Sequence, residues 1–165
     1  DIFAHAMERV TGKRLPQIIS ERLWVPMGAE EDANITVDSI GYGLACGGVS
    51  ASLRDLARFG DAMLKEGLVN GKQVIPEKWI NDVRHGTHGL PLAKYFEKGH
   101  YRNQFWVEDS NKGSHFCLGV FGQLIYVAPQ SKMVAVKFST WPTFRSEEFV
   151  TYTTRALHAI ANELN

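Results

Sequence analysis

Apolar residues repeat at three- and four-residue intervals through the first part of the chain. A first run covers residues 2–10 and stops at Gly12, and a second covers residues 15–24 and is broken by Pro26. This spacing places the apolar side chains on one face of a helix, and glycine and proline are typical helix terminators. The pattern therefore predicts two consecutive helices near the N-terminus.

The clearest helix signal follows an irregular, glycine-rich stretch over residues 29–50. Ser52 can cap a helix N-terminus, Asp55 stands three residues further on, and Gly67 suits the C-terminal end. The predicted buried stripe consists of Leu53, Leu56, Ala57, Gly60, Met63 and Leu64. We expect the charged residues Arg54, Asp55 and Arg58 to form a solvated or helix-stabilising face.

A shorter helix is predicted to begin at Pro76, because proline is well tolerated at a first helical position. The spacing of Trp79, Ile80 and Val83 predicts that these side chains face inward. This helix is the last before the hydrophobic pattern changes its period.

From about residue 100 the pattern is typical of strands. We predict a short strand over residues 105–107, a longer one over 116–127, and a third over 133–139 after a Pro-containing turn. A long amphipathic helix is expected from about Thr143 to the end. Helices followed by antiparallel strands and a closing helix predict an α+β fold, in which the last helix packs on the sheet.

Composition and charge are typical of a globular protein. The chain has 165 residues, 44% of them hydrophobic and 22% charged, and we treat residues 1–165 as part of a single domain. Lys and Arg together number 18, as do Asp and Glu. This balance argues against a nucleic-acid partner or an anionic membrane surface. The apolar runs are also shorter than a membrane-spanning helix requires.

The cysteines and histidines indicate neither a metal centre nor a cofactor. Cys46 and Cys117 form no C-x-x-C pair, so we expect two buried free thiols rather than a zinc site, although their separation does not forbid a disulfide. Among the histidines, only His85 and His88 have a spacing that could suit a metal, and the pattern is weak.

The chain contains no recognised motif for a serine nucleophile. In S-x-x-K enzymes a lysine one helical turn after the serine activates the hydroxyl. No serine of this chain has a lysine three residues later, and neither G-x-S-x-G, H-E-x-x-H nor a P-loop is present. The chain alone is therefore predicted to be catalytically inactive.

Four stretches, taken in order, nevertheless resemble one enzyme family: residues 2–24, 47–60 with the letters GGVSASLRDLARFG, 70–76, and 116–129. Together they are similar to the second half of the β-lactamase-related, penicillin-recognising serine hydrolases. The likeness is greatest to the branch with 6-aminohexanoate-dimer hydrolases and class C β-lactamase-like esterases. This resemblance implies a partial serine β-lactamase/DD-peptidase-like fold.

The resemblance also implies which parts of the catalytic centre belong elsewhere. The family's S-x-x-K and Tyr-x-Asn motifs would precede Asp1, so the chain would need the N-terminal portion of the same domain as its partner. Tyr101-Arg102-Asn103 matches Tyr-x-Asn by letter, but it falls in the strand region, and we treat it as a chance match.

The third catalytic motif of the family aligns with Cys117-Leu118-Gly119. The backbone N–H of Val120 would then donate to the oxyanion that forms when a carbonyl is attacked. Gly119 would let substrate approach the strand closely. The alternative is a core strand in which the glycine marks a bulge.

Other residues are implied to contact the substrate. Trp106 precedes Val120 by 14 residues, a spacing similar to that of a pocket tryptophan in this branch, although a core position is equally compatible with the sequence. The glycine-rich loop would bring Tyr42 and Cys46 to the cleft, unless it is a plain connector. Neither Cys117 nor Leu118 supplies the cation that holds a β-lactam carboxylate.

The expected function is hydrolysis of a small amide or ester substrate through an acyl-serine intermediate. The absent cation favours amidase or esterase activity over β-lactamase or D-Ala-D-Ala carboxypeptidase activity, which remains the alternative within the family. A non-catalytic binding or structural module that keeps this half of the fold is the alternative from another class.

Overall fold

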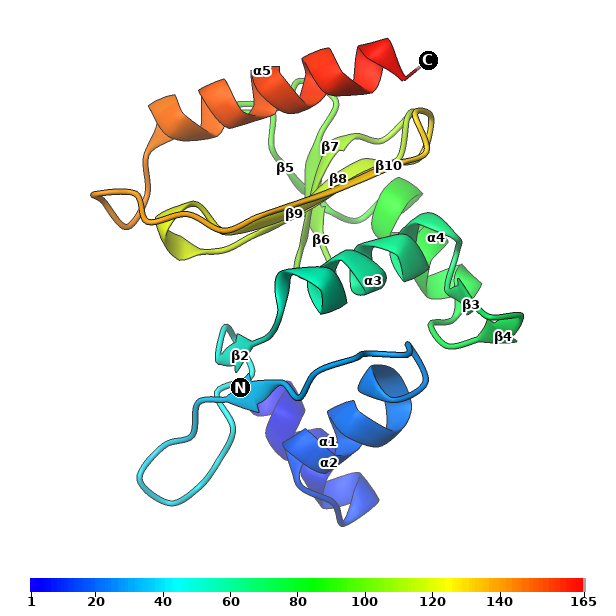
Figure 1. Cartoon of the computed structure of the whole chain (residues 1–165), viewed down its shortest axis with the longest axis vertical. Helices are drawn as coiled ribbons and strands as arrows, with labels where there is room; N and C mark the ends of the chain where they lie inside the picture. The colour runs from blue at the N-terminus through cyan, green and yellow to red at the C-terminus, as the bar shows by residue number, and fades with distance from the viewer. Residues whose placement is uncertain (165) are drawn as a thin grey trace.

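The computed structural model describes residues 1–164 as helices on both faces of an antiparallel sheet (Figure 1). The six strands lie in the order β10-β9-β8-β7-β6-β5, and every neighbouring pair is antiparallel. The strands are β5 (Leu90–Pro91), β6 (His100–Arg102), β7 (Phe105–Asp109), β8 (Ser114–Leu118), β9 (Leu124–Ala128) and β10 (Met133–Lys137). The α+β class predicted from the sequence is confirmed.

Helices cover the two faces of this sheet unequally. In Figure 1, α5 crosses one face and α3 the other, while α1 and α2 lie farther from the sheet. The helices are α1 (Ile2–Thr11), α2 (Leu15–Ile19), which continues as a π-helical turn (Ser20–Trp24), α3 (Leu53–Leu64), α4 (Glu77–His85) and α5 (Glu147–Glu163). Two short antiparallel pairs complete the elements: β1 (Asn34–Ile35) with β2 (Val49–Ser50), and β3 (Leu68–Val69) with β4 (Lys72–Gln73).

The alternation of side chains along the strands divides the core into two clusters. The cluster under α3 and α4 contains Ala62, Met63, Ile80, Val83, Val107 and Val127. The cluster under α5 contains Phe116, Tyr126, Met133, Leu157 and Ala161. Gly60 lets α3 approach the sheet closely, because a Cβ there would lie 2.5 Å from the side chain of Val134.

The prediction of one long strand over residues 116–127 is wrong. The chain reverses at a 3₁₀ turn (Val120–Gly122), so β8 and β9 pair with each other, with Leu118 opposite Leu124. The apolar run continues through the reversal, which is why periodicity alone predicted a single strand. The predicted pairing of the following hairpin is confirmed, because β10 is antiparallel to β9.

Two other details differ from the sequence-based expectation. The last helix begins at Glu147 rather than near Thr143, because Ser146 caps it by accepting a hydrogen bond from the Phe149 N–H at 3.2 Å. Trp79, expected to face inward, is 37% exposed, whereas Ile80 and Val83 are buried as predicted.

The apolar face predicted for α1 exists, but most of it is exposed. Ile2, Phe3 and Val10 are each more than 80% exposed, and Met7 is 43% exposed. The helical period was therefore correct, while the packing partner of this face does not lie among residues 1–164.

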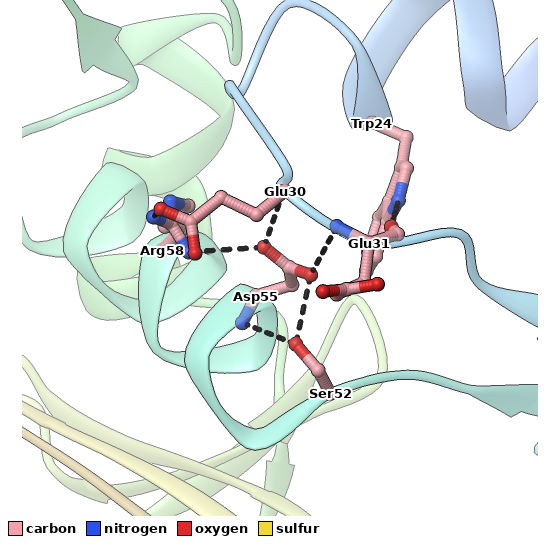
Figure 2. A network of polar contacts seen from close by, with 6 residues as sticks. All are labelled: Trp24, Glu30, Glu31, Ser52, Asp55 and Arg58. Atoms are coloured by element: carbon pink, nitrogen blue, oxygen red, sulfur yellow. Dashed lines mark hydrogen bonds and ion pairs between the residues drawn. The ribbon is translucent and has the colours of Figure 1, made fainter.

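Asp55, expected on a solvated or helix-stabilising face, is fully buried (Figure 2). Its carboxylate accepts hydrogen bonds from the Glu30 N–H at 2.9 Å, the Glu31 N–H at 3.1 Å and the Ser52 hydroxyl at 2.8 Å, and it pairs with Arg58 at 3.0 Å. The Glu30 hydrogen bond is the main cause that holds the pKa of Asp55 below its usual range. The buried charge therefore fastens the loop before β1 to the start of α3.

His115 is a second polar group in the core. It lies on β8 with no exposed surface, its Nδ1 is 2.8 Å from the Gly113 carbonyl oxygen, and its Nε2 has no hydrogen-bond partner among residues 1–164. Phe105 contacts the imidazole edge-to-face at 5.6 Å. Burial lowers the pKa of His115 to about 4, and the charge of Arg84 acts in the same direction.

We expect His115 to make the fold acid-sensitive. Its folded pKa of about 4 is below the unfolded value of about 6.5, so the unfolded state binds the proton more tightly. The free energy of unfolding should therefore fall between these pH values, by about 3 kcal/mol in total. Urea unfolding of wild type and His115→Gln from pH 4 to 7 measures the difference. The exposed His88→Gln variant is the control, and a wild-type slope no steeper than that of His115→Gln would contradict the assignment.

Candidate active site

A cavity of about 560 Å³ lies between the sheet and α5. Its walls come from β7, β8, the 120–122 turn, β9, the segment before α5, and α5 itself. Four residues predicted from the sequence line it together: Trp106, Leu118, Gly119 and Val120. Aromatic residues from separate segments, Tyr95, Phe96, Phe116, Trp141 and Phe144, make much of the remaining wall.

Hydrogen bonds fix the 120–122 turn at the edge of this cavity. The Gly119 N–H donates to the Gln123 carbonyl at 2.8 Å. The Phe121 N–H donates to the Phe144 carbonyl at 3.0 Å, and the Phe121 carbonyl accepts from the Trp141 N–H at 3.1 Å. These contacts hold Phe121 in the left-handed region at φ 54°, a conformation that non-glycine residues adopt mainly when the surroundings impose it.

Val120 differs from its neighbours in this turn. Val120 is 46% exposed. Among the turn, loop and cap hydrogen bonds of residues 1–164, none is donated by the Val120 N–H. Val120 is the first residue of the 3₁₀ turn, so its N–H also lacks a partner within that turn. The turn thus presents an unused backbone donor beside the cavity.

Trp106 lies among aromatic rings and a cation. Its ring contacts Tyr101 edge-to-face at 5.3 Å and Tyr95 at 6.3 Å. The guanidinium of Arg145 lies 5.8 Å from the Trp106 ring centre and 5.3 Å from that of Tyr95. Sequence reasoning missed Arg145. The available signal was a single cation at the end of the aromatic segment 141–145, between the last strand and the last helix.

The side of the cavity toward α5 is polar. A carboxylate oxygen of Glu108 lies 2.6 Å from the His158 Nε2, within hydrogen-bond distance, and Glu108 also accepts hydrogen bonds from the Tyr126 and Ser114 hydroxyls, both at 3.1 Å. Burial, together with the nearby Glu108 charge, raises the pKa of Tyr126 above its usual range. This cluster joins α5 to three strands. It was not predicted, because its members lie up to 50 residues apart in sequence.

Cys117 points away from this cavity. It packs against the core cluster under α3, whereas the adjacent Leu118 packs against the cluster under α5. This follows from strand alternation, which sends neighbouring side chains to opposite faces. Burial raises the pKa of the Cys117 thiol to about 12, so the thiol stays protonated at neutral pH.

Tyr42 and Cys46 lie in another part of the structure. Tyr42 packs between the guanidinium of Arg14, at 4.4 Å from the ring centre, and the ring of His5, at 4.5 Å. The Cys46 N–H donates to the Asp1 carboxylate at 3.2 Å, and its thiol is free but exposed, contrary to the expectation of a buried one. Neither residue lines the cavity beside Val120.

The Tyr101-Arg102-Asn103 segment has a structural role in the described chain. It ends β6, and positive φ values at Asn103 and Gln104 form the tight turn into β7. The Asn103 amide and the Arg102 guanidinium both bind Asp82. No cluster of three or more potential metal ligands occurs within residues 1–164. None of the helices described there is long and apolar enough to cross a membrane.

The antiparallel sheet with a closing C-terminal helix resembles the fold of a β-lactamase-like hydrolase domain. The chain belongs to the Beta-lactamase family, whose profile matches residues 1–160. It is 37% identical over 147 residues to the 6-aminohexanoate-dimer hydrolase of Paenarthrobacter ureafaciens. This match covers 86% of this chain and 38% of the relative.

Two further proteins are similar to this chain. An uncharacterized protein of Alkalihalophilus pseudofirmus is 32% identical over 112 residues, covering 61% of this chain and 32% of that protein. A solved structure from Bacillus anthracis, provisionally assigned as a 6-aminohexanoate-dimer hydrolase, is 33% identical with a TM-score of 0.86. That match covers 98% of this chain and 41% of the solved one. The matches therefore span about two fifths of the Paenarthrobacter ureafaciens and Bacillus anthracis proteins.

Proposed function

We propose that this chain is the C-terminal portion of a serine hydrolase that cleaves amide or ester bonds through an acyl-serine intermediate. The observation that carries the proposal is the Val120 N–H. It is a backbone donor without a partner among residues 1–164, and it lies at the edge of a cavity whose wall includes Trp106. Attack on a carbonyl builds negative charge on oxygen, and a preorganised N–H stabilises that charge without reorganisation.

In this proposal each residue around the turn has a definite role. The Val120 N–H donates to the tetrahedral oxyanion, and Gly119 keeps the approach to it open. Trp106 and Leu118 bind the aliphatic part of the substrate, which suits their place in the cavity wall. Cys117 contributes through its backbone, because its side chain packs in the other core cluster. Tyr42 and Cys46 would form a separate part of the cleft, closed by the rest of the domain.

The nucleophile, its lysine and the catalytic tyrosine would come from the N-terminal portion of the same domain. Two exposed features support this partner. The apolar face of α1 has no covering element among residues 1–164, and β10 is an edge strand of the sheet. An edge strand and an exposed apolar face are surfaces that further elements of a domain normally cover.

A β-lactamase or D-Ala-D-Ala carboxypeptidase is the second candidate. Arg145 favours it, because its guanidinium lies beside the cavity and could bind the carboxylate that such substrates carry. The aromatic side chains in the cavity wall and the absence of a cation at Cys117 and Leu118 favour linear amides and esters instead.

We expect the full-length protein to rank its substrates accordingly. The kcat/KM for p-nitrophenyl esters and for short linear amides of 6-aminohexanoate should exceed that for nitrocefin. Steady-state kinetics on one enzyme preparation measures all three substrate classes. A higher kcat/KM for nitrocefin would identify the parent as a β-lactamase and overturn the amidase and esterase assignment.

A further inference from the structure

Lys137 holds the 120–122 turn from the side of β10. Its ammonium donates to the Gly122 carbonyl at 3.1 Å and to the Ser139 hydroxyl at 2.5 Å, and it lies 4.7 Å from the centre of the Trp141 ring. All three partners are neutral. Lys137 is partly buried, and no carboxylate among residues 1–164 forms an ion pair with its ammonium, so its positive charge lies beside the turn without a paired anion.

The surroundings keep this ammonium in place. Gln123 exchanges two hydrogen bonds with the Ser139 backbone, and Trp141 packs against Gly122, where a Cβ would lie 2.3 Å from the indole. Gly122 has φ +87°, so both its conformation and the lack of space favour glycine. The lysine, the indole and the turn therefore form one rigid unit.

We propose that Lys137 is a positioning residue for the oxyanion site. Its hydrogen bond to Gly122 fixes the turn that presents the Val120 N–H, and its uncompensated charge raises the electrostatic potential where the oxyanion forms. The inference rests on the proposed function. It adds Lys137 to the Val120 N–H as a second group that stabilises the negative charge of the oxyanion. The desolvation that lowers the pKa of Lys137 is consistent with a charge kept in a partly water-excluded position.

Three substitutions in the full-length protein test whether the charge of Lys137 contributes more than its hydrogen bonding. Lys137→Met removes both, Lys137→Gln keeps a neutral donor, and Lys137→Arg keeps a cation. We expect the kcat for p-nitrophenyl acetate to fall roughly 10-fold in the Met and Gln variants and to stay within about two-fold of wild type in the Arg variant. KM should change by less than about two-fold in all three, because the effect acts on the transition state.

Lys65→Met, at an exposed position directly after α3, is the matched control and should retain wild-type kinetics. Circular dichroism and the melting temperature of each variant establish folding. If the Met variant fails to fold, the Gln and Arg pair decides the question. A Gln variant with wild-type kcat would overturn the electrostatic role of Lys137. The serine-hydrolase proposal would still stand in that case, because the wild-type protein would still hydrolyse the ester. A wild-type protein with no turnover of any ester or amide would overturn both proposals.

Discussion

Val120→Pro should lower the kcat of the full-length enzyme by roughly 10²–10³-fold, the usual consequence of losing one oxyanion donor. Proline lacks the backbone N–H and so removes the donor itself. The substitution is expected to fit the fold, because the Val120 N–H supports no described backbone hydrogen bond. The preceding Gly119 also has extended dihedral angles, φ −99° and ψ 173°, which are compatible with a following proline.

Val120→Ala is the matched control for this experiment. It keeps the N–H and removes only part of an exposed side chain, so most of the activity should remain. Both variants must match the wild-type circular dichroism spectrum and melting profile. A folded Val120→Pro enzyme with near-wild-type kcat would place the oxyanion hole elsewhere.

The 165-residue chain on its own should show no saturable turnover of p-nitrophenyl acetate or nitrocefin. The physical reason is the missing activated nucleophile: none of its serines has a lysine one helical turn later. A donor and a binding cavity without that nucleophile cannot form an acyl intermediate. Turnover that is saturable and lost on mutation of one serine of this chain would contradict the expectation.

The sequence predicted the helices well because their signals are local. The Ser52 cap, the glycine after the first helix and the 3.6-residue period of the apolar positions all act within a few turns. The limits of these elements were less certain, as the late start of α5 shows, because Thr143 and Ser146 are both suitable cap residues and only the structure shows that Ser146 caps the helix.

What the sequence could not provide was contact between distant segments. Asp55 was expected on a solvated or helix-stabilising face, because nothing near it in sequence shows that the Glu30 and Glu31 N–H groups reach its carboxylate (Figure 2). The reversal at Val120–Gly122 was hidden for a similar reason. Phe121 adopts a positive φ only because the 141–144 segment binds both of its backbone groups.

The candidate site was predicted in part. Trp106, Leu118, Gly119 and Val120 gather at one cavity, while Cys117 faces the other core cluster. Arg145 and Lys137 were missed, because each acts through side chains that come together only after the last strand and the last helix have packed.

The most direct test of the account locates the acyl group. The full-length protein is incubated with p-nitrophenyl acetate, quenched in acid during the burst phase, digested and mapped by mass spectrometry. The account predicts one acetyl group on a serine encoded upstream of Asp1 and followed three residues later by lysine, with residues 1–165 unmodified. A catalytically competent acetyl group on a residue of this chain, or ester turnover without any acyl-serine intermediate, would contradict the central claim.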